Sequence, residues 1–104
     1  MLENSIYSVI TPEGCAAILW KDAKESPRAA ASMKVTAPDL RSLGIVDQVI
    51  TEPGEGAQGD WDATAAILKD AILTALQEVD GLSSAARLSA RYQKFREMGK
   101  ILER

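Results

Sequence analysis

Few types of side chain in this sequence could take part in catalysis or metal binding. Its 104 residues include no histidine and one cysteine, with fifteen Asp and Glu and twelve Lys and Arg. Without histidine there is no Ser–His or Cys–His nucleophile pair, no imidazole base and no histidine metal ligand. One cysteine can neither close an intramolecular disulfide nor build a cysteine-rich zinc site. Carboxylates, lysine, tyrosine and backbone amides remain, or no chemistry within this chain.

Cys15 and Glu13 fall in the first turn of a helix that Thr11 and Pro12 are expected to start. The positive end of the helix dipole can stabilise a thiolate, but apolar residues follow Cys15, which favours a small buried hydrophobic side chain. The favourable interaction of the Glu13 carboxylate with the helix dipole is enough to explain a glutamate at this position, and Glu13 could also line a pocket. Gly14 is a poor helix former, so we expect another group to pack closely against the backbone there.

Three further features carry weaker signals. The glycines between residues 53 and 60 do not match a phosphate-binding loop, because no lysine follows them and the Gly-x-Gly-x-x-Gly spacing is absent. Asp47 interrupts an apolar stretch, which is consistent with an edge hydrogen bond or a subunit contact. Trp20 and Trp61 are most simply core or interface anchors. No nucleophile, base and orienting group occur together, so we assign no catalytic residue and no metal ligand.

The N-terminal half is expected to alternate short strands with short helices. Residues 5–10 and 45–50 are rich in β-branched and aromatic side chains, which predicts two strands. Helices are predicted to start at Pro12, at Arg28 and near Thr36, and Gly44 supplies a left-handed residue after the third. Two strands do not make an independently stable sheet. We therefore expect the missing strands to come from a larger fold or from an obligate oligomer.

The C-terminal half predicts two amphipathic helices joined by a turn. Asp60 caps the first, which runs from Trp61 to about Val79 with apolar side chains recurring every three or four residues. Ser83 or Ser84 caps the second. We expect these two helices to lie antiparallel and to support each other.

The net charge of −3 is unevenly distributed along the chain. Residues 87–104 hold six basic and two acidic side chains, a net charge of +4, so the remainder carries −7. Such a basic segment could bind nucleic acid or an anionic membrane, or dock as a helix face on an acidic partner. Aromatic groups do not alternate with the charges as they do in single-strand binders, which favours the acidic partner, and we expect no nucleic acid.

Membrane and export signals are not apparent in the sequence. No apolar run approaches the ~20 residues that a bilayer span needs. The first residues show neither a basic leader nor a cleavage pattern, so we expect no signal peptide. The expected location is the cytoplasm, or an organelle stroma after processing.

The run from Glu3 to Lys21, ENSIYSVITPEGCAAILWK, resembles a run of the carboxyltransferase alpha subunits of acetyl-CoA carboxylase, E-N-x-x-Y-S-V-I-[ST]-P-E-G-C-A-A-I-L-W-K. Four later segments are also similar to that family: 34–40, 43–50, 52–57 and 91–99. Gln58 and Gly59 depart from it, since the family usually has a polar pair such as His-Arg there. The family's glycine-rich turn, which forms an oxyanion hole, precedes the matching region. We therefore expect a C-terminal portion of the subunit, whether a natural fragment, a truncated reading frame or a deliberately made piece.

The resemblance implies an α/β fold of partial crotonase type (ClpP/crotonase-like), predominantly helical, with the two short strands and a C-terminal helical pair. It also implies a division into residues 1–52, belonging to the crotonase-type core, a Gly/Pro loop at 53–60 and a helical extension at 61–104. In crotonase-like folds the helix start that matches Thr11, Pro12, Glu13 and Gly14 lies near the active-site wall. By that analogy these four residues are the expected substrate-binding residues.

The activity that the resemblance implies is carboxyl transfer from carboxybiotin on a carrier protein to acetyl-CoA, giving malonyl-CoA for fatty acid biosynthesis within an ATP-binding complex. Backbone N–H groups stabilise the oxyanions in this chemistry, so no histidine is required. The implied partners are the beta subunit, which holds the zinc, a second alpha subunit in a heterotetramer, and the biotin carboxyl carrier protein. No cofactor is expected in this chain, and biotin and acetyl-CoA are substrates of the full enzyme.

Two functions remain open from the residues and the resemblance together. In the first, the chain is part of the carboxyltransferase and is inactive when isolated. In the second, it is a non-catalytic interaction module that binds carboxylase subunits through its C-terminal helices.

Overall fold

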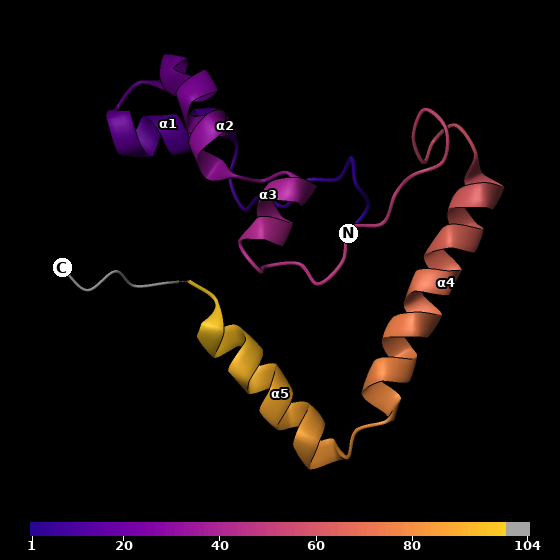
Figure 1. Cartoon of the computed structure of the whole chain (residues 1–104). Coiled ribbons are helices and arrows are strands. Elements are labelled where there is room, and N and C mark those ends of the chain that lie inside the picture. Colours follow the sequence, from indigo (N-terminus) through magenta and orange to yellow (C-terminus); the bar gives the residue numbers. More distant parts are fainter. Residues whose placement is uncertain (100–104) are drawn as a thin grey trace.

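The structure is a computed structural model that describes residues 1–99, and these residues form a chain of helices joined by irregular segments (Figure 1). Lys100 and Arg104 of the expected basic segment, with the end of the expected 61–104 extension, lie outside the described residues. In chain order the elements are α1 (Pro12–Trp20), the 3-10 turn η1 (Ala23–Glu25), α2 (Ser26–Met33), α3 (Ala37–Ser42), α4 (Trp61–Asp80) and α5 (Ser84–Glu97).

Side-chain caps begin three of these helices where the sequence predicts them. The Oγ1 atom of Thr11 accepts from the Gly14 N–H at 3.1 Å, and Asp60 Oδ1 accepts from the third residue of α4 at 2.9 Å. Ser83 caps α5 in the same way at 3.2 Å. These side chains satisfy N–H groups that have no partner within the helix. Gly44 has a φ of +70° after α3, as expected for the left-handed residue that ends a helix.

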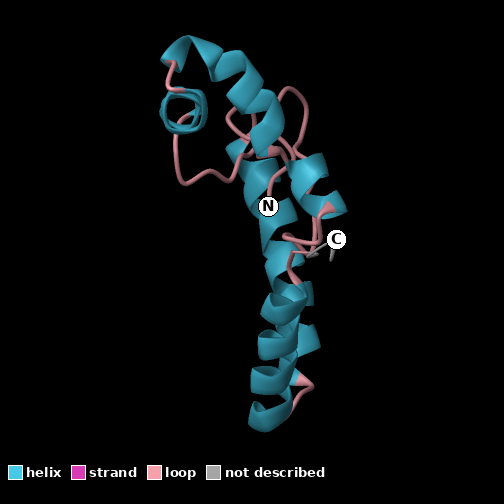
Figure 2. Cartoon of the chain, turned by 90° about the vertical axis from the view of Figure 1, so that its left-hand side faces the viewer, coloured by secondary structure: helices cyan, strands magenta, loops and turns pink. Residues whose placement is uncertain are grey.

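The two predicted strands, at 5–10 and 45–50, do not form among the described residues, and this expectation was wrong for the chain as it stands (Figure 2). Two isolated bridges remain: Leu2 pairs with Ile50 in parallel, and Ile6 pairs with Thr36 in antiparallel orientation. The two segments thus pair with different neighbours and not with each other. Strand propensity describes fitness for a sheet surface, and without adjacent strands the ladder does not extend beyond one pair.

The buried core of the described part is small. Ala16, Ala29 and Ala37 are completely buried, and Leu40 and Val46 are nearly so. Helices α1 and α2 pack against each other and against η1. The radius of gyration is 17.5 Å, whereas a compact domain of this length has one of about 13 Å. The molecule is open and flat, 49 × 43 × 18 Å, and Figure 2 shows it almost edge-on.

Helices α4 and α5 do not pack along each other, contrary to the expected antiparallel pair. They diverge from their connection at residues 81–83 and form the two arms of a V (Figure 1). Each arm faces the irregular segment at 45–50 instead, and α5 is tied to that segment by an ion pair between Lys94 and Asp47. Among residues 1–99 no helix combines the length and the apolar character needed to cross a bilayer.

Leu40 and Leu43 provide a matched test of this small core. Leu40 is buried in α3, whereas Leu43 directly follows that helix and is half exposed. We expect Leu40→Ala to lower the free energy of unfolding by about 2–3 kcal/mol through lost burial and the cavity left behind. Leu43→Ala is expected to cost less than about 1 kcal/mol. Urea unfolding followed by circular dichroism measures both, and equal losses would contradict the burial assignment.

Candidate functional site

The first turn of α1 places the four expected substrate-binding residues on one short stretch of backbone. Thr11 has an extended conformation, and its carbonyl oxygen accepts from the Cys15 N–H at 2.9 Å while its hydroxyl caps the helix. Pro12 occupies the first helical position, where no N–H is needed. The Glu13 side chain is exposed beside the positive end of the helix dipole.

Another side chain packs closely on Gly14, as its position in the sequence predicts. A Cβ atom built on Gly14 would lie 3.0 Å from Ile10 Cγ1 and 3.2 Å from Ile10 Cδ1. The Ile10 side chain therefore packs directly on the backbone of the helix start. This contact fixes the direction in which the chain enters α1.

An apolar groove of about 430 Å³ opens beside this turn. The segment before α1, the start of α1, the C-terminal part of α2 and Val35 line it. The lining residues are Ile6, Ser8, Val9, Ile10, Thr11, Pro12, Ala30, Met33 and Val35. Thr11 and Pro12 thus line the groove, whereas Glu13 and Gly14 are not among its lining residues. Nothing in this geometry assigns a substrate to the groove, and the binding role of the four residues stays a prediction.

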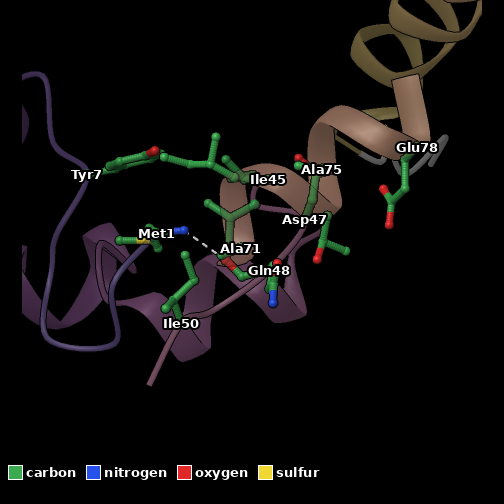
Figure 3. Close-up of a pocket in the computed structure, with 12 residues that line it drawn as sticks. Met1, Tyr7, Ile45, Asp47, Gln48, Ile50, Ala71, Ala75 and Glu78 are labelled. Atoms are coloured by element: carbon green, nitrogen blue, oxygen red, sulfur yellow. Dashed lines mark hydrogen bonds between the residues drawn. The ribbon is translucent and has the colours of Figure 1, made fainter. Parts of the chain in front are cut away.

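A second pocket, of about 530 Å³, lies between the N-terminal segment, residues 45–50 and α4 (Figure 3). Tyr7 and Ile45 are at one end in Figure 3, and Glu78 of α4 is at the other. The N-terminal ammonium of Met1 donates to the Gln48 carbonyl at 2.8 Å on its wall. Sequence reasoning missed this pocket, because no local pattern relates the first residues to a helix more than sixty positions later.

Two glutamates tie the ends of the 1–52 region together. The Glu52 carboxylate accepts from the Ala57 N–H at 2.7 Å and from the Asn4 N–H at 3.1 Å, and Glu3 accepts from the Glu52 N–H at 2.7 Å. Hydrogen bonds to the charged form, from Ala57 first and then from Asn4, lower the pKa of Glu52. The two carboxylates therefore hold the backbone of residues 3–4 against residues 52–57.

Asp47 makes the ion pair that attaches α5. Lys94 Nζ donates to both carboxylate oxygens of Asp47, at 2.6 and 2.5 Å. That hydrogen bond is the main reason that the pKa of Asp47 is lowered. The sequence suggested an edge hydrogen bond or a subunit contact here, and within the chain the partner is a helix 47 positions away.

The remaining candidate groups do not assemble into a reactive centre. Cys15 lies in the first turn of α1 and is half-buried, less enclosed than the sequence suggested. Within residues 1–99 no group of three or more Cys, Asp or Glu is placed to hold a metal ion. The glycines after Glu52 form two successive turns, with Gly56 N–H donating to the Pro53 carbonyl and Gly59 N–H to the Gly56 carbonyl.

The sequence matches the family described as acetyl co-enzyme A carboxylase carboxyltransferase-like over residues 1–99. The chain belongs to this family. It is 50% identical over 103 residues to the acetyl-coenzyme A carboxylase carboxyl transferase subunit alpha of Trichormus variabilis, covering 99% of this chain and 32% of that protein. The subunit of Thermus thermophilus is likewise 50% identical over 103 residues, covering 99% of this chain and 33% of the relative. The Oceanobacillus iheyensis subunit is 51% identical over 102 residues, covering 98% and 32%.

The chain thus spans about a third of the length of the curated relatives that it matches. It corresponds to a portion of a carboxyltransferase alpha subunit, and the family resemblance seen in the sequence is confirmed. The match includes the α1 turn, the apolar groove and both C-terminal helices as far as residue 99.

Thr11 allows a first test of the α1 turn. We expect Thr11→Ala to lower the free energy of unfolding by about 1 kcal/mol, because the Gly14 N–H loses its acceptor. Thr11→Ser keeps the hydroxyl and is expected to stay within a few tenths of a kcal/mol of the parent. Thermal and urea unfolding measure both variants, and an equal loss in the two would show that the hydroxyl does not cap α1.

Asp47 gives a pH-dependent test. Its pKa is lower in the folded chain, so the stabilisation from Lys94 is present above the unfolded pKa of about 3.9 and is lost as the pH falls through the folded value. Because the pair is largely exposed, Asp47→Asn is expected to cost roughly 0.2–1 kcal/mol at pH 7. Unfolding free energies measured from pH 7 to pH 2 should show the gap closing. Asp70→Asn on α4 is the control, and the same closing gap there would contradict the assignment.

Proposed function

We propose that this chain takes part in carboxyl transfer from carboxybiotin to acetyl-CoA, giving malonyl-CoA, as the C-terminal portion of a carboxyltransferase alpha subunit. The observation that carries the proposal is the identity of about half of its residues with those subunits over nearly its whole length. The absence of histidine fits the proposal, since backbone N–H groups suffice to stabilise the oxyanions of such a transfer.

Within that reaction, Thr11, Pro12, Glu13 and Gly14 form part of the substrate pocket wall. Two of them, Thr11 and Pro12, already line the apolar groove. The capped and tightly packed helix start gives this wall a fixed position, which is what substrate orientation requires. The remainder of the pocket, including the oxyanion-forming glycine turn, comes from outside these residues.

The larger protein in this proposal has a crotonase-type fold of repeated ββα units. Residues 5–10 and 45–50 are then strands completed by neighbours that this chain does not itself supply. The partners are a beta subunit, a second alpha subunit and the biotin carboxyl carrier protein, and biotin acts on the carrier and not as a group bound here. The location is the cytoplasm.

A chimera tests the proposal directly. The matching third of the Thermus thermophilus alpha subunit is replaced by residues 1–99 of this chain and co-expressed with the beta subunit of that organism. We expect malonyl-CoA formation from carboxybiotin and acetyl-CoA at no less than about a tenth of the parent rate, because the replaced part is 50% identical. The isolated chain with the beta subunit is expected to form none.

The controls separate folding from function. Size-exclusion chromatography establishes that the chimera assembles with the beta subunit. An assembled chimera without activity contradicts the proposal, and so does malonyl-CoA formation by the isolated chain above the rate without it. Glu13→Gln in the active chimera is expected to raise the KM for carboxybiotin or for acetyl-CoA several-fold, with little change in assembly. If the KM for both substrates is unchanged, Glu13 does not line the substrate pocket.

A second candidate function is favoured by the uncovered apolar faces of α4 and α5. In this alternative the chain binds carboxylase subunits without contributing to the site. An inactive chimera that still assembles with the beta subunit is the result that this alternative predicts.

A further inference from the structure

Ile10 belongs both to the apolar groove and to the turn that begins α1. Its side chain lines the groove, and its Cγ1 and Cδ1 atoms would lie 3.0 and 3.2 Å from a Cβ atom built on Gly14. An apolar residue just before the N-cap often packs on a side chain near the helix start, and this contact fixes the angle at which the chain enters the helix. Thr11 is the N-cap here, so Ile10 holds that position and packs on the glycine backbone instead.

Ser8 holds the backbone of Ile10 in place. The Ser8 hydroxyl donates to the Ile10 carbonyl oxygen at 2.5 Å and accepts from the Ile10 N–H at 3.4 Å. Both backbone groups of Ile10 are thus bonded to one side chain two positions earlier, while the side chain of Val9 between them is fully exposed. The hydroxyl therefore closes a bend at residues 9 and 10, directly before the N-cap of α1.

The N-cap orders the turn internally and does not set this angle. The bond from the Gly14 N–H to the Thr11 hydroxyl lies within the turn and involves no residue before Thr11. A capping box would add a bond from a Glu or Gln side chain at the third helical position back to the N-cap N–H. Gly14 occupies that third position and has no side chain to make such a bond. The contacts of Ser8 and Ile10 therefore supply a connection between the turn and the preceding segment that the cap lacks.

We propose that Ser8 and Ile10 are positioning residues for the proposed carboxyl transfer. The Ser8 hydroxyl fixes Ile10, and Ile10 sets where the turn from Thr11 to Gly14 stands relative to the groove. This inference rests on the proposed function, in which that turn is part of the substrate pocket wall. Because a displacement of about 1 Å in a group that orients a substrate can lower a rate about a hundredfold, loss of either contact is expected to lower kcat/KM.

Matched substitutions in the active chimera that carries residues 1–99 test this role. Ser8→Ala removes the hydroxyl, and Ser8→Thr keeps it. Ile10→Ala removes the contact with Gly14, and the control Ile6→Ala shortens another isoleucine of the same groove, whose atoms are not among those nearest to Gly14. We expect Ser8→Ala and Ile10→Ala each to lower kcat/KM for malonyl-CoA formation by about tenfold or more. Ser8→Thr and Ile6→Ala are expected to stay within about threefold of the parent.

The double variant distinguishes positioning from two separate structural effects. If Ser8 acts through Ile10, Ser8→Ala combined with Ile10→Ala loses no more activity than Ile10→Ala alone, whereas independent effects multiply. Rates are compared per assembled complex, measured by size-exclusion chromatography with the beta subunit, so that a loss of folded protein does not count as a loss of activity. If Ile10→Ala does not assemble, Ile10→Val, which lacks only the Cδ1 methyl group, takes its place and is expected to lower kcat/KM about threefold or more.

The outcomes separate this role from the proposed function. An assembled parent chimera without activity contradicts the proposed function, and the positioning role is contradicted with it. An active parent chimera whose Ser8→Ala and Ile10→Ala variants keep the parent kcat/KM overturns the positioning role alone. Losses that multiply in the double variant also overturn it, because Ser8 then does not act through Ile10. Equal losses in Ile6→Ala and Ile10→Ala assign the effect to the groove lining and likewise overturn it.

Discussion

Within residues 1–99, large apolar side chains are left uncovered on several surfaces. They lie on the segment at 5–10, on α1, on α4 and on α5, while the buried apolar side chains of this part are three alanines, a leucine and a valine. Hydrophobic burial is the main favourable term in folding, at roughly 25 cal/mol per Å² of apolar area. A chain that covers so little of its apolar surface depends on surfaces that lie outside it.

This dependence explains the form of the candidate site. The α1 turn is well determined locally, by the Thr11 cap and by the packing of Ile10 on Gly14. The groove beside it is open to solvent, and side chains that line it, such as Ile6 and Val9, are largely exposed. Local interactions therefore fix the α1 turn, and under the proposed function the carboxyltransferase assembly supplies the rest of the substrate pocket.

Local interactions were predictable from the sequence, and long-range ones were not. The caps at Thr11, Asp60 and Ser83 use hydroxyl or carboxylate side chains three residues before the N–H that they accept from, which is a pattern visible in the sequence. The prediction of two strands was wrong because a strand forms only beside another strand, and the local sequence pattern does not show whether such a neighbour is present. The ion pair between Asp47 and Lys94, and the divergence of α4 from α5, depend on contacts across tens of residues that no local pattern records.

Amide hydrogen exchange measured in two contexts tests the central claim, that the uncovered segments of this chain are completed by surrounding protein. The isolated chain and an assembled alpha–beta complex containing residues 1–99 are compared at the amides of Ser8 and Val9, since the Tyr7 N–H is already bonded to the Val35 carbonyl. The account predicts fast exchange in the isolated chain and at least a hundredfold slower exchange in the complex, where these amides join a sheet. Equal exchange rates in both contexts would contradict it.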